Sequence, residues 1–300
     1  MAVISSPFRC RYCGADNMSI WCHATDQNRR AGTQVFTVAR CNSCGILQTH
    51  PLLAPEELST YYPDEYFPDP RQSAALRAFE RKKVDLVRRF CNGGRLLDVG
   101  AGVGLFVREA QDAGFAAEGI ELSAQAVDLG RQSLGVRLTS GDLLDLPMPA
   151  DAFDIVTLWH VLEHLPNPKA SLEKIFQILR KSGALIIAVP NAGSLQARVF
   201  RSRWFHLDVP RHLFHYTRTS LTGVLRDAGF DVQQVIFRHA EHDRAGILGS
   251  IMRLSPPGES LFHKLLRKGI GAPVAALLAA GEAFLSGESG TFVAIARKKE

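Results

Sequence analysis

A glycine-rich turn near residue 100 constrains this 300-residue chain more than any other feature of its sequence. An apolar run with one acid, residues 96–99, meets glycines at positions 100, 102 and 104, and a helix-like run follows at 105–113. Glycine adopts φ > 0 and has no Cβ, so such a turn lets the backbone approach a ligand closely. A helix that begins there also offers unpaired N–H groups. The pattern predicts a strand, a ligand-binding turn and a helix.

Further apolar segments indicate strands that alternate with helical segments. The expected strands cover residues 115–120, 136–140, 151–159, 184–189, 231–238 and 291–296. This alternation predicts an α/β fold, in which a parallel sheet has helices on both faces. Ligands of such sheets bind beyond the carboxyl ends of the strands. Four side chains fall at those ends: Asp98, Glu121, Asp142 and Trp159.

Two motifs connect the chain to a known family. Residues 98–104 (DVGAGVG) resemble motif I of class I S-adenosylmethionine (SAM)-dependent methyltransferases. Residues 160–168 (HVLEHLPNP) resemble a segment common in the small-molecule members of that class. The resemblance covers about residues 75–300. It implies a Rossmann-like seven-stranded methyltransferase sheet, whose last strand is antiparallel and inserts between its neighbours.

The resemblance also implies the cofactor, SAM, and the residues that hold it. These are Asp98, Gly100, Gly102, Gly104, Glu121, Leu122, Asp142, Leu143 and Trp159. The two acceptor oxygens of Glu121 would take both ribose hydroxyls, and Asp142 would bind the adenine amino group. The alternative for Glu121 is that it caps the helix that starts near Ser123.

A second strong pattern lies near the start of the chain, where two C-x-x-C-G pairs supply Cys10, Cys13, Cys41 and Cys44. Four thiolates paired in this way suit a structural Zn²⁺ with tetrahedral coordination. We therefore expect a small N-terminal zinc-ribbon module, with four cysteine ligands, whose ion takes no part in methyl transfer. An unmetallated set of cysteines, or two disulfides, are the alternatives.

With 46% hydrophobic content, the chain can bury one core in a small module and another in a large domain. We expect the zinc-ribbon module at residues 1–52, a linker or lid at 53–73, and the methyltransferase domain at 74–300. The first ten residues lack the features of a signal peptide. A cytoplasmic protein is therefore expected, with a peripheral position at the inner membrane face as the alternative.

The methyltransferase domain is expected to contain a helical insertion at 239–290. Residues 261–285 combine basic and apolar side chains, a composition that can lie on an anionic membrane surface. The same helices can alternatively cap the acceptor pocket or form a dimer face. The sequence does not predict the oligomeric state.

A basic segment, residues 191–226, has arginines and histidines but a single acid, Asp208. Arginine forks suit a phosphate or carboxylate on the acceptor, whereas a solvated basic loop is the alternative. Within this segment, residues 204–215 resemble a stretch of methyltransferases found with surface-polysaccharide and glycolipid enzymes. An anionic small molecule or a glycolipid is therefore the expected acceptor.

Three residues are candidates for catalysis. His160 directly follows the strand at 151–159 and is the first candidate for the base that takes a proton from a hydroxyl acceptor. His212 is the second candidate, and Arg211 is expected to grip an anionic group of the acceptor. Glu163 and His164 are expected to shape the loop rather than to react.

These features predict a SAM-dependent methyltransferase that modifies a hydroxyl of a sugar, nucleotide-sugar or glycolipid. An RNA methyltransferase with a zinc ribbon and a non-catalytic interaction protein on a SAM-binding fold are the alternatives. Phosphate tracking needs a broad basic face, and the zinc module is only mildly basic, so no nucleic acid is expected as a partner. The intact glycines of the turn argue against the non-catalytic alternative.

Overall fold

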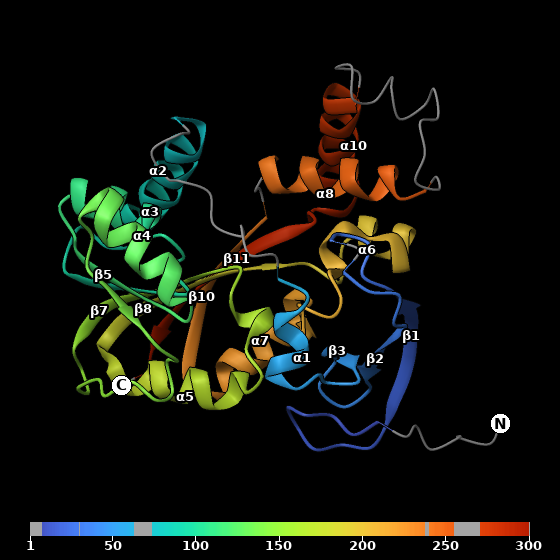
Figure 1. Ribbon diagram of the computed structural model, residues 1–300, viewed down its shortest axis with the longest axis horizontal. Coiled ribbons are helices and arrows are strands. Elements are labelled where there is room, and N and C mark those ends of the chain that lie inside the picture. Colours follow the sequence, from blue (N-terminus) through green and yellow to red (C-terminus); the bar gives the residue numbers. More distant parts are fainter. Residues whose placement is uncertain (1–7, 30, 63–73, 238–239, 255–270, 300) are drawn as a thin grey trace.

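The computed structural model describes residues 8–29, 31–62, 74–237, 240–254 and 271–299 (Figure 1). Its strands are β1 (Met18–Ala24), β2 (Phe36–Cys41), β3 (Leu47–His50), β4 (Arg95–Val99), β5 (Ala116–Glu121), β6 (Leu138–Ser140), β7 (Phe153–Trp159), β8 (Leu179–Pro190), β9 (Phe214–His215), β10 (Phe230–Ile236) and β11 (Thr291–Lys298). Its helices are α1 (Pro55–Ser59), α2 (Ala74–Arg88), α3 (Leu105–Asp112), α4 (Ala124–Leu134), α5 (Pro168–Ile178), α6 (Leu195–Phe200), α7 (Arg218–Asp227), α8 (Ala240–Met252) and α10 (Gly271–Ser286), with short 3-10 helices η2 (Leu162–His164), η3 (Arg201–Arg203) and η4 (Phe205–Leu207). Parts of the expected linker and of the expected insertion lie outside the described residues.

The main sheet has seven strands in the order β10-β11-β8-β7-β4-β5-β6. Strands β4 to β8 pair in parallel, whereas β11 is antiparallel to both of its neighbours, β8 and β10. This confirms the expected sheet and the inserted antiparallel last strand. Because β5 and β7 lie on opposite sides of β4, the strand order reverses at β4, where sheets of this kind bind ligands.

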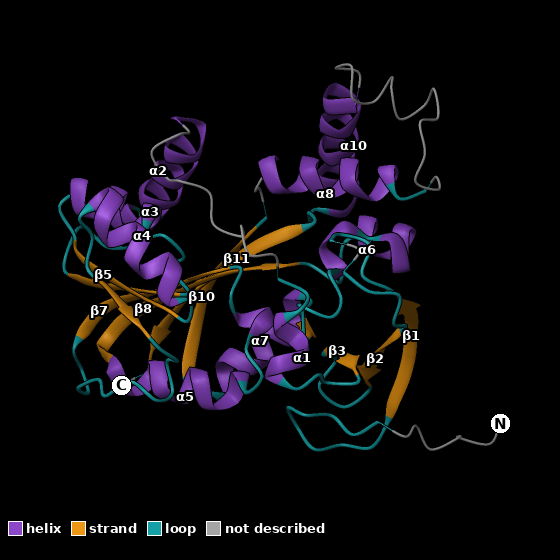
Figure 2. Ribbon diagram, in the orientation of Figure 1, coloured by secondary structure: helices purple, strands orange, loops and turns teal. Residues whose placement is uncertain are grey.

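Helices bury both faces of this sheet, because alternate residues of a strand point to opposite faces. Leu97 shares a buried cluster with Leu172 of α5 and Leu221 of α7. Its neighbour Leu96 belongs to a second cluster with side chains of α2, α3 and α4, among them Val107. Figure 2 shows the two helix layers on either side of the sheet.

Strand β8 begins at Leu179, whereas the sequence predicts that it begins at residue 184. Its first residues, 180–182, are polar and exposed, so the apolar pattern that marks a buried strand is absent there. Arg180 instead forms an ion pair with Asp154, with Nη1 2.7 Å from Oδ1. The ion pair with Asp154 of β7 therefore holds the exposed residues that precede the buried part of β8.

A second sheet has four strands in the order β1-β2-β3-β9, and β9 comes from the chain segment that follows β8. Leu47 of β3 pairs with His215 of β9 in antiparallel register. Arg11 supports the same junction, since its Nη2 donates to the carbonyl oxygens of Thr49 (3.1 Å) and Leu213 (2.9 Å). The N-terminal module and the methyltransferase domain thus share one sheet.

Helices α8 and α10 come between β10 and β11 in the chain. They pack against each other and lie close to α6 (Figure 1). Glu282 of α10 accepts hydrogen bonds from the backbone N–H and from Nε2 of Gln196 in α6, at 3.0 and 2.9 Å. Leu277 and Phe284 of α10 are 75% and 89% exposed. Within the described ranges, no helix has the length and apolar character needed to cross a bilayer. The membrane contact expected over 261–285 lies partly outside these ranges and stays a prediction.

Candidate active site

The glycine turn after β4 has a backbone that requires glycine. Gly100, Gly102 and Gly104 have φ angles of 70°, 54° and 78°, a region that other residues rarely adopt. A Cβ on Gly100 would lie 2.5 Å from Cγ2 of Val161. The turn and the loop after β7 therefore touch at the carboxyl edge of the sheet, and α3 begins directly after Gly104.

Glu121, at the end of β5, binds the backbone of the glycine turn. Its Oε2 accepts a hydrogen bond from the N–H of Gly102 (2.8 Å), and its Oε1 accepts one from the N–H of Ser123 (3.0 Å). Ser123 is itself the N-cap of α4, where its side chain accepts from the N–H of Ala126. A carboxylate has about four acceptor sites, so Glu121 can hold the turn and still accept from ribose hydroxyls.

Asp98 lies beneath the turn and is 3% exposed. Burial raises the pKa of its carboxyl to about 7, although a hydrogen bond from Oγ1 of Thr157 (2.6 Å) and the charge of Lys83 oppose the increase. The charges of Glu80 and Glu121 add to the increase. Asp98 therefore changes its charge near neutral pH, next to the turn expected to bind a cationic cofactor.

This pKa gives a prediction for cofactor binding. Below about pH 7 Asp98 is protonated, and above it the carboxylate attracts the cationic sulfonium. SAM affinity is therefore expected to rise about tenfold between about pH 6 and pH 8. Calorimetric titrations across that range measure the effect. The Asp98→Asn variant should show a flatter profile, and an equally steep one would assign the change to another group.

The other residues expected to hold SAM are at the ends of neighbouring strands: Leu122, Asp142, Leu143 and Trp159. Leu122 is 72% exposed and open to a ligand. Asp142 accepts a hydrogen bond from the N–H of Leu144 (2.8 Å), which fixes its carboxylate after β6. Trp159 packs edge to face on Phe106, with ring centroids 5.4 Å apart. All nine residues thus lie at the tips of β4 to β7, and their contacts with SAM stay predictions.

Three histidines and one carboxylate gather beside the turn. His160 Nδ1 lies 3.4 Å from Oε1 of Glu163, whose side chain is 1% exposed. Burial raises the pKa of Glu163 and lowers the pKa of His212 to about 4. One ligand atom each of Glu163, His164 and His212 lies within 4.8 Å of the others. The two candidate bases, His160 and His212, are therefore connected through Glu163, which the sequence analysis did not treat as a functional residue.

Arg211 was expected to grip an anionic group of the acceptor, but its side chain is buried, with 2% exposed. Its guanidinium donates to both carboxylate oxygens of Asp26 and of Asp208 and to the carbonyl oxygen of Tyr61. Burial opposes the ionisation of Asp208, but the hydrogen bonds from Arg211 outweigh it and lower the pKa of that carboxyl. No N–H remains for an anionic acceptor, which corrects the role expected for Arg211.

Replacing Arg211 with alanine should destabilise the fold. It leaves the buried carboxylate of Asp26 without its cation, a change that costs about 3–5 kcal/mol in buried ion pairs. Urea denaturation measures the free energy of unfolding. The exposed Arg203 offers a control, since Arg203→Ala should change stability by less than about 0.5 kcal/mol. Equal stability of the two variants would contradict a structural role for Arg211.

The four cysteines of the N-terminal module gather as the sequence predicts. The Sγ atoms of Cys10 and Cys44 are 3.7 Å apart and those of Cys13 and Cys41 are 3.6 Å apart. Disulfide sulfurs are about 2.05 Å apart, so these cysteines are not paired covalently. Four sulfurs at about 2.3 Å from a tetrahedral zinc are about 3.8 Å from one another. Gln48 Nε2 also donates to Sγ of Cys10 at 2.8 Å. The donor set and its spacing fit zinc.

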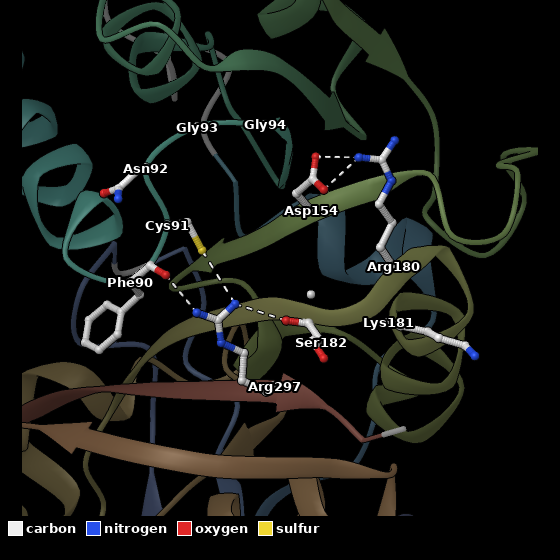
Figure 3. Close-up of a pocket in the computed structure, with 11 residues that line it drawn as sticks. Phe90, Cys91, Asn92, Gly93, Gly94, Asp154, Arg180, Lys181, Ser182 and Arg297 are labelled. Carbon is white, nitrogen blue, oxygen red and sulfur yellow. Dashed lines mark hydrogen bonds and ion pairs between the residues drawn. The ribbon is translucent and has the colours of Figure 1, made fainter.

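A hollow with a volume of about 310 Å³ lies elsewhere, at the amino ends of the strands (Figure 3). Arg297 lines it and donates to the carbonyl oxygens of Phe90 (2.7 Å) and Ser182 (3.0 Å), while Arg180 pairs with Asp154. Its arginines are therefore engaged by the protein itself. Since ligands of parallel sheets bind at the carboxyl ends, this hollow is not the cofactor site.

Solved structures share the fold. A SAM-dependent methyltransferase from Archaeoglobus fulgidus superposes with a TM-score of 0.52 and 19% identity, covering 74% of this chain and 94% of that one. A methyltransferase from Haloferax volcanii, solved with the Trm112 methyltransferase activator, gives the same score and identity, covering 75% and 90%.

Curated relatives match in sequence over a shorter region. A ubiquinone biosynthesis O-methyltransferase from Azoarcus sp. (strain BH72) is 31% identical over 118 residues, covering 36% of this chain and 50% of that protein. A malonyl-[acyl-carrier protein] O-methyltransferase from Serratia marcescens is 29% identical over 122 residues, covering 40% and 47%. The chain spans about half the length of the curated relatives it matches.

The family model described as a methyltransferase domain matches residues 71–235, more than half of the chain. This region contains the glycine turn, the acids at the ends of β4 and β5, and the histidine-rich loop after β7. It confirms the resemblance drawn from the sequence, and the chain belongs to this methyltransferase family.

Proposed function

We propose that this protein transfers a methyl group from SAM to an oxygen atom of a small-molecule acceptor. The observation that carries the proposal is the contact between the glycine turn, tied to Glu121, and the loop that bears His160. In a chain of the methyltransferase family, this contact brings a cofactor site and a candidate base to the same edge of the sheet. The two O-methyltransferases among the relatives support oxygen as the acceptor atom.

The chain's own residues would supply mainly position and proton removal. SAM supplies a methyl group on a sulfonium, which already has a good leaving group. The turn and Glu121 hold the cofactor, and such alignment can lower a barrier by about 7–11 kcal/mol. His160 is 20% exposed and its Nδ1 lies 3.4 Å from Oε1 of Glu163. We propose it as the base that takes the proton of an acceptor hydroxyl. A base in this position adds roughly 10²–10⁴-fold to the rate.

The acceptor class that we propose is a sugar, a nucleotide-sugar or a glycolipid. The resemblance of residues 204–215 to methyltransferases of surface-polysaccharide clusters supports this class. Arg198 and Arg203 are exposed on α6 and η3, which follow the carboxyl end of β8. They are suited to an anionic acceptor, because arginine pairs with phosphate and carboxylate through two parallel hydrogen bonds.

We also propose that Cys10, Cys13, Cys41 and Cys44 hold a structural zinc ion. The sulfur spacing supports a closed tetrahedral site, in which no position is left for substrate. The ion would therefore stabilise the N-terminal module and would not take part in methyl transfer.

Isothermal titration of SAM and of its demethylated product into zinc-loaded protein tests the function. We expect micromolar binding of both, followed by uptake of label from methyl-labelled SAM when nucleotide-sugars and glycolipids are screened. Absence of SAM binding would overturn the enzyme assignment and favour an interaction protein on this fold. Binding with label uptake only into RNA would overturn the acceptor class.

A further inference from the structure

Glu163 lies in the loop after β7 with a carboxylate that the protein does not satisfy. Its side chain is 1% exposed, and among the described residues neither carboxylate oxygen has a hydrogen-bond partner. A carboxylate removed from water without partners is strongly destabilised. His160 Nδ1, at 3.4 Å, makes a charged pair only when it is protonated. The carboxylate is therefore neutralised either by a proton or by a positive group that it can bind.

Two histidines beside Glu163 have the tautomer of metal ligands. His164 Nδ1 lies 3.0 Å from the carbonyl oxygen of Arg211, and His212 Nδ1 lies 2.8 Å from the carbonyl oxygen of His206. A carbonyl oxygen only accepts, so each Nδ1 carries the proton and donates it. The lone pair of each ring is then on Nε2. Histidines that bind metals are held in this way, with the other ring N–H donated to a carbonyl or carboxylate.

We propose that Glu163, His164 and His212 bind a divalent transition-metal ion through one carboxylate oxygen and two Nε2 atoms. One ligand atom of each lies within 4.8 Å of the other two, so modest side-chain rotations give the about 3 Å separations around an ion bound at about 2.1 Å. Two imidazoles and one carboxylate suit first-row divalent ions such as iron, manganese and zinc. Asp208 Oδ2 lies 3.9 Å from Nε2 of His212 but is held by Arg211, so it stays outside the ligand set.

Three protein ligands leave coordination positions open, and an oxygen of the acceptor would take one of them. The ion would then orient the acceptor hydroxyl and ease the loss of its proton. His212 would be a ligand and not a base, which leaves His160 as the candidate base. This role of the ion rests on the proposed function, whereas the metal site itself does not.

Mn²⁺ added to zinc-loaded full-length protein tests the site, because the four-cysteine cluster is then filled and manganese is a poor thiolate binder. Electron paramagnetic resonance of the free ion measures binding, and we expect one Mn²⁺ per chain. Pulsed measurements should show nitrogen couplings from imidazole in the wild-type chain. Glu163→Gln keeps the shape of the side chain and should weaken binding by at least about tenfold. Glu173→Gln, on the exposed side of α5, is the matched control and should bind as the wild type does.

Three outcomes would overturn the metal site. They are no Mn²⁺ binding by the wild type, bound Mn²⁺ without imidazole couplings, or undiminished binding by a folded Glu163→Gln variant. If that variant does not fold, the wild-type couplings decide the question. SAM titration in metal-free buffer separates the two proposals, since loss of SAM binding contradicts the proposed function and leaves the metal result intact.

Discussion

Replacement of Cys10 by serine is expected to abolish zinc binding and to lower the midpoint of thermal unfolding by about 10 °C or more. Cys10 is 2% exposed and its sulfur is 3.7 Å from that of Cys44, so no other group can replace it without moving the module. Structural zinc contributes about 10–16 kcal/mol to the folding of small zinc modules, and a variant that no longer binds the ion loses this contribution. Differential scanning calorimetry and the metal content of the purified protein measure the two effects.

Cys22 provides the matched control for this variant. It lies in the same module, on β1, but outside the cluster of four sulfurs. Cys22→Ser should therefore keep one zinc ion per chain and most of the thermal stability. If the Cys10→Ser variant melts with the wild type and the wild type contains no zinc, the four cysteines are only a packed set of thiols.

The second large effect is expected at the cofactor site, where Glu121→Ala should lower SAM affinity by at least about 100-fold. Hydrogen bonds to a charged group contribute about 1.5–3 kcal/mol each, and the carboxylate is expected to accept from two ribose hydroxyls. The variant also removes the acceptor for the N–H of Gly102, so the turn itself loses a support. Isothermal titration of SAM gives the affinity, and circular dichroism checks the fold.

Glu118 lies on the same strand and forms an exposed ion pair with Arg95, with Oε1 3.1 Å from Nη2. Glu118→Ala removes an equal charge from β5 and should leave SAM affinity within about twofold, because exposed pairs contribute little. A similar loss in both variants would indicate a general effect of charge. A Glu121→Ala variant that binds SAM as tightly as the wild type would leave Glu121 with only its role in the turn.

The sequence was sufficient for those features that depend on short-range patterns. The parallel part of the main sheet follows from alternating strands and helices, and the turn follows from glycines whose φ angles other residues rarely adopt. The four-cysteine cluster likewise follows from two short spacings. Each of these patterns is local, so each is visible in a single sequence.

The features that sequence analysis missed depend on contacts between distant segments. Asp26 and Arg211 are 185 positions apart, and no local pattern connects an acid before β2 with an arginine after β8. The exposed start of β8 had no apolar pattern to show it. For Glu163 a signal was available: a carboxylate between two histidines of one short motif, residues 160–164. Only the structure shows that this carboxylate is buried without a hydrogen-bond partner and that His212 lies close to it.

The two-residue strand β9 makes the boundary near residue 52 a poor place to divide this protein. A fragment cut there would expose the backbone edge of β3, and open strand edges promote aggregation. The remainder would keep Arg211 but lose Asp26, the buried one of its two carboxylate partners. Exchange of the zinc-bearing part between relatives should therefore succeed only when the β9 segment and Asp208 to Arg211 are exchanged with it. Most of the module is encoded near the start of the chain, but residues about 200 positions later complete it.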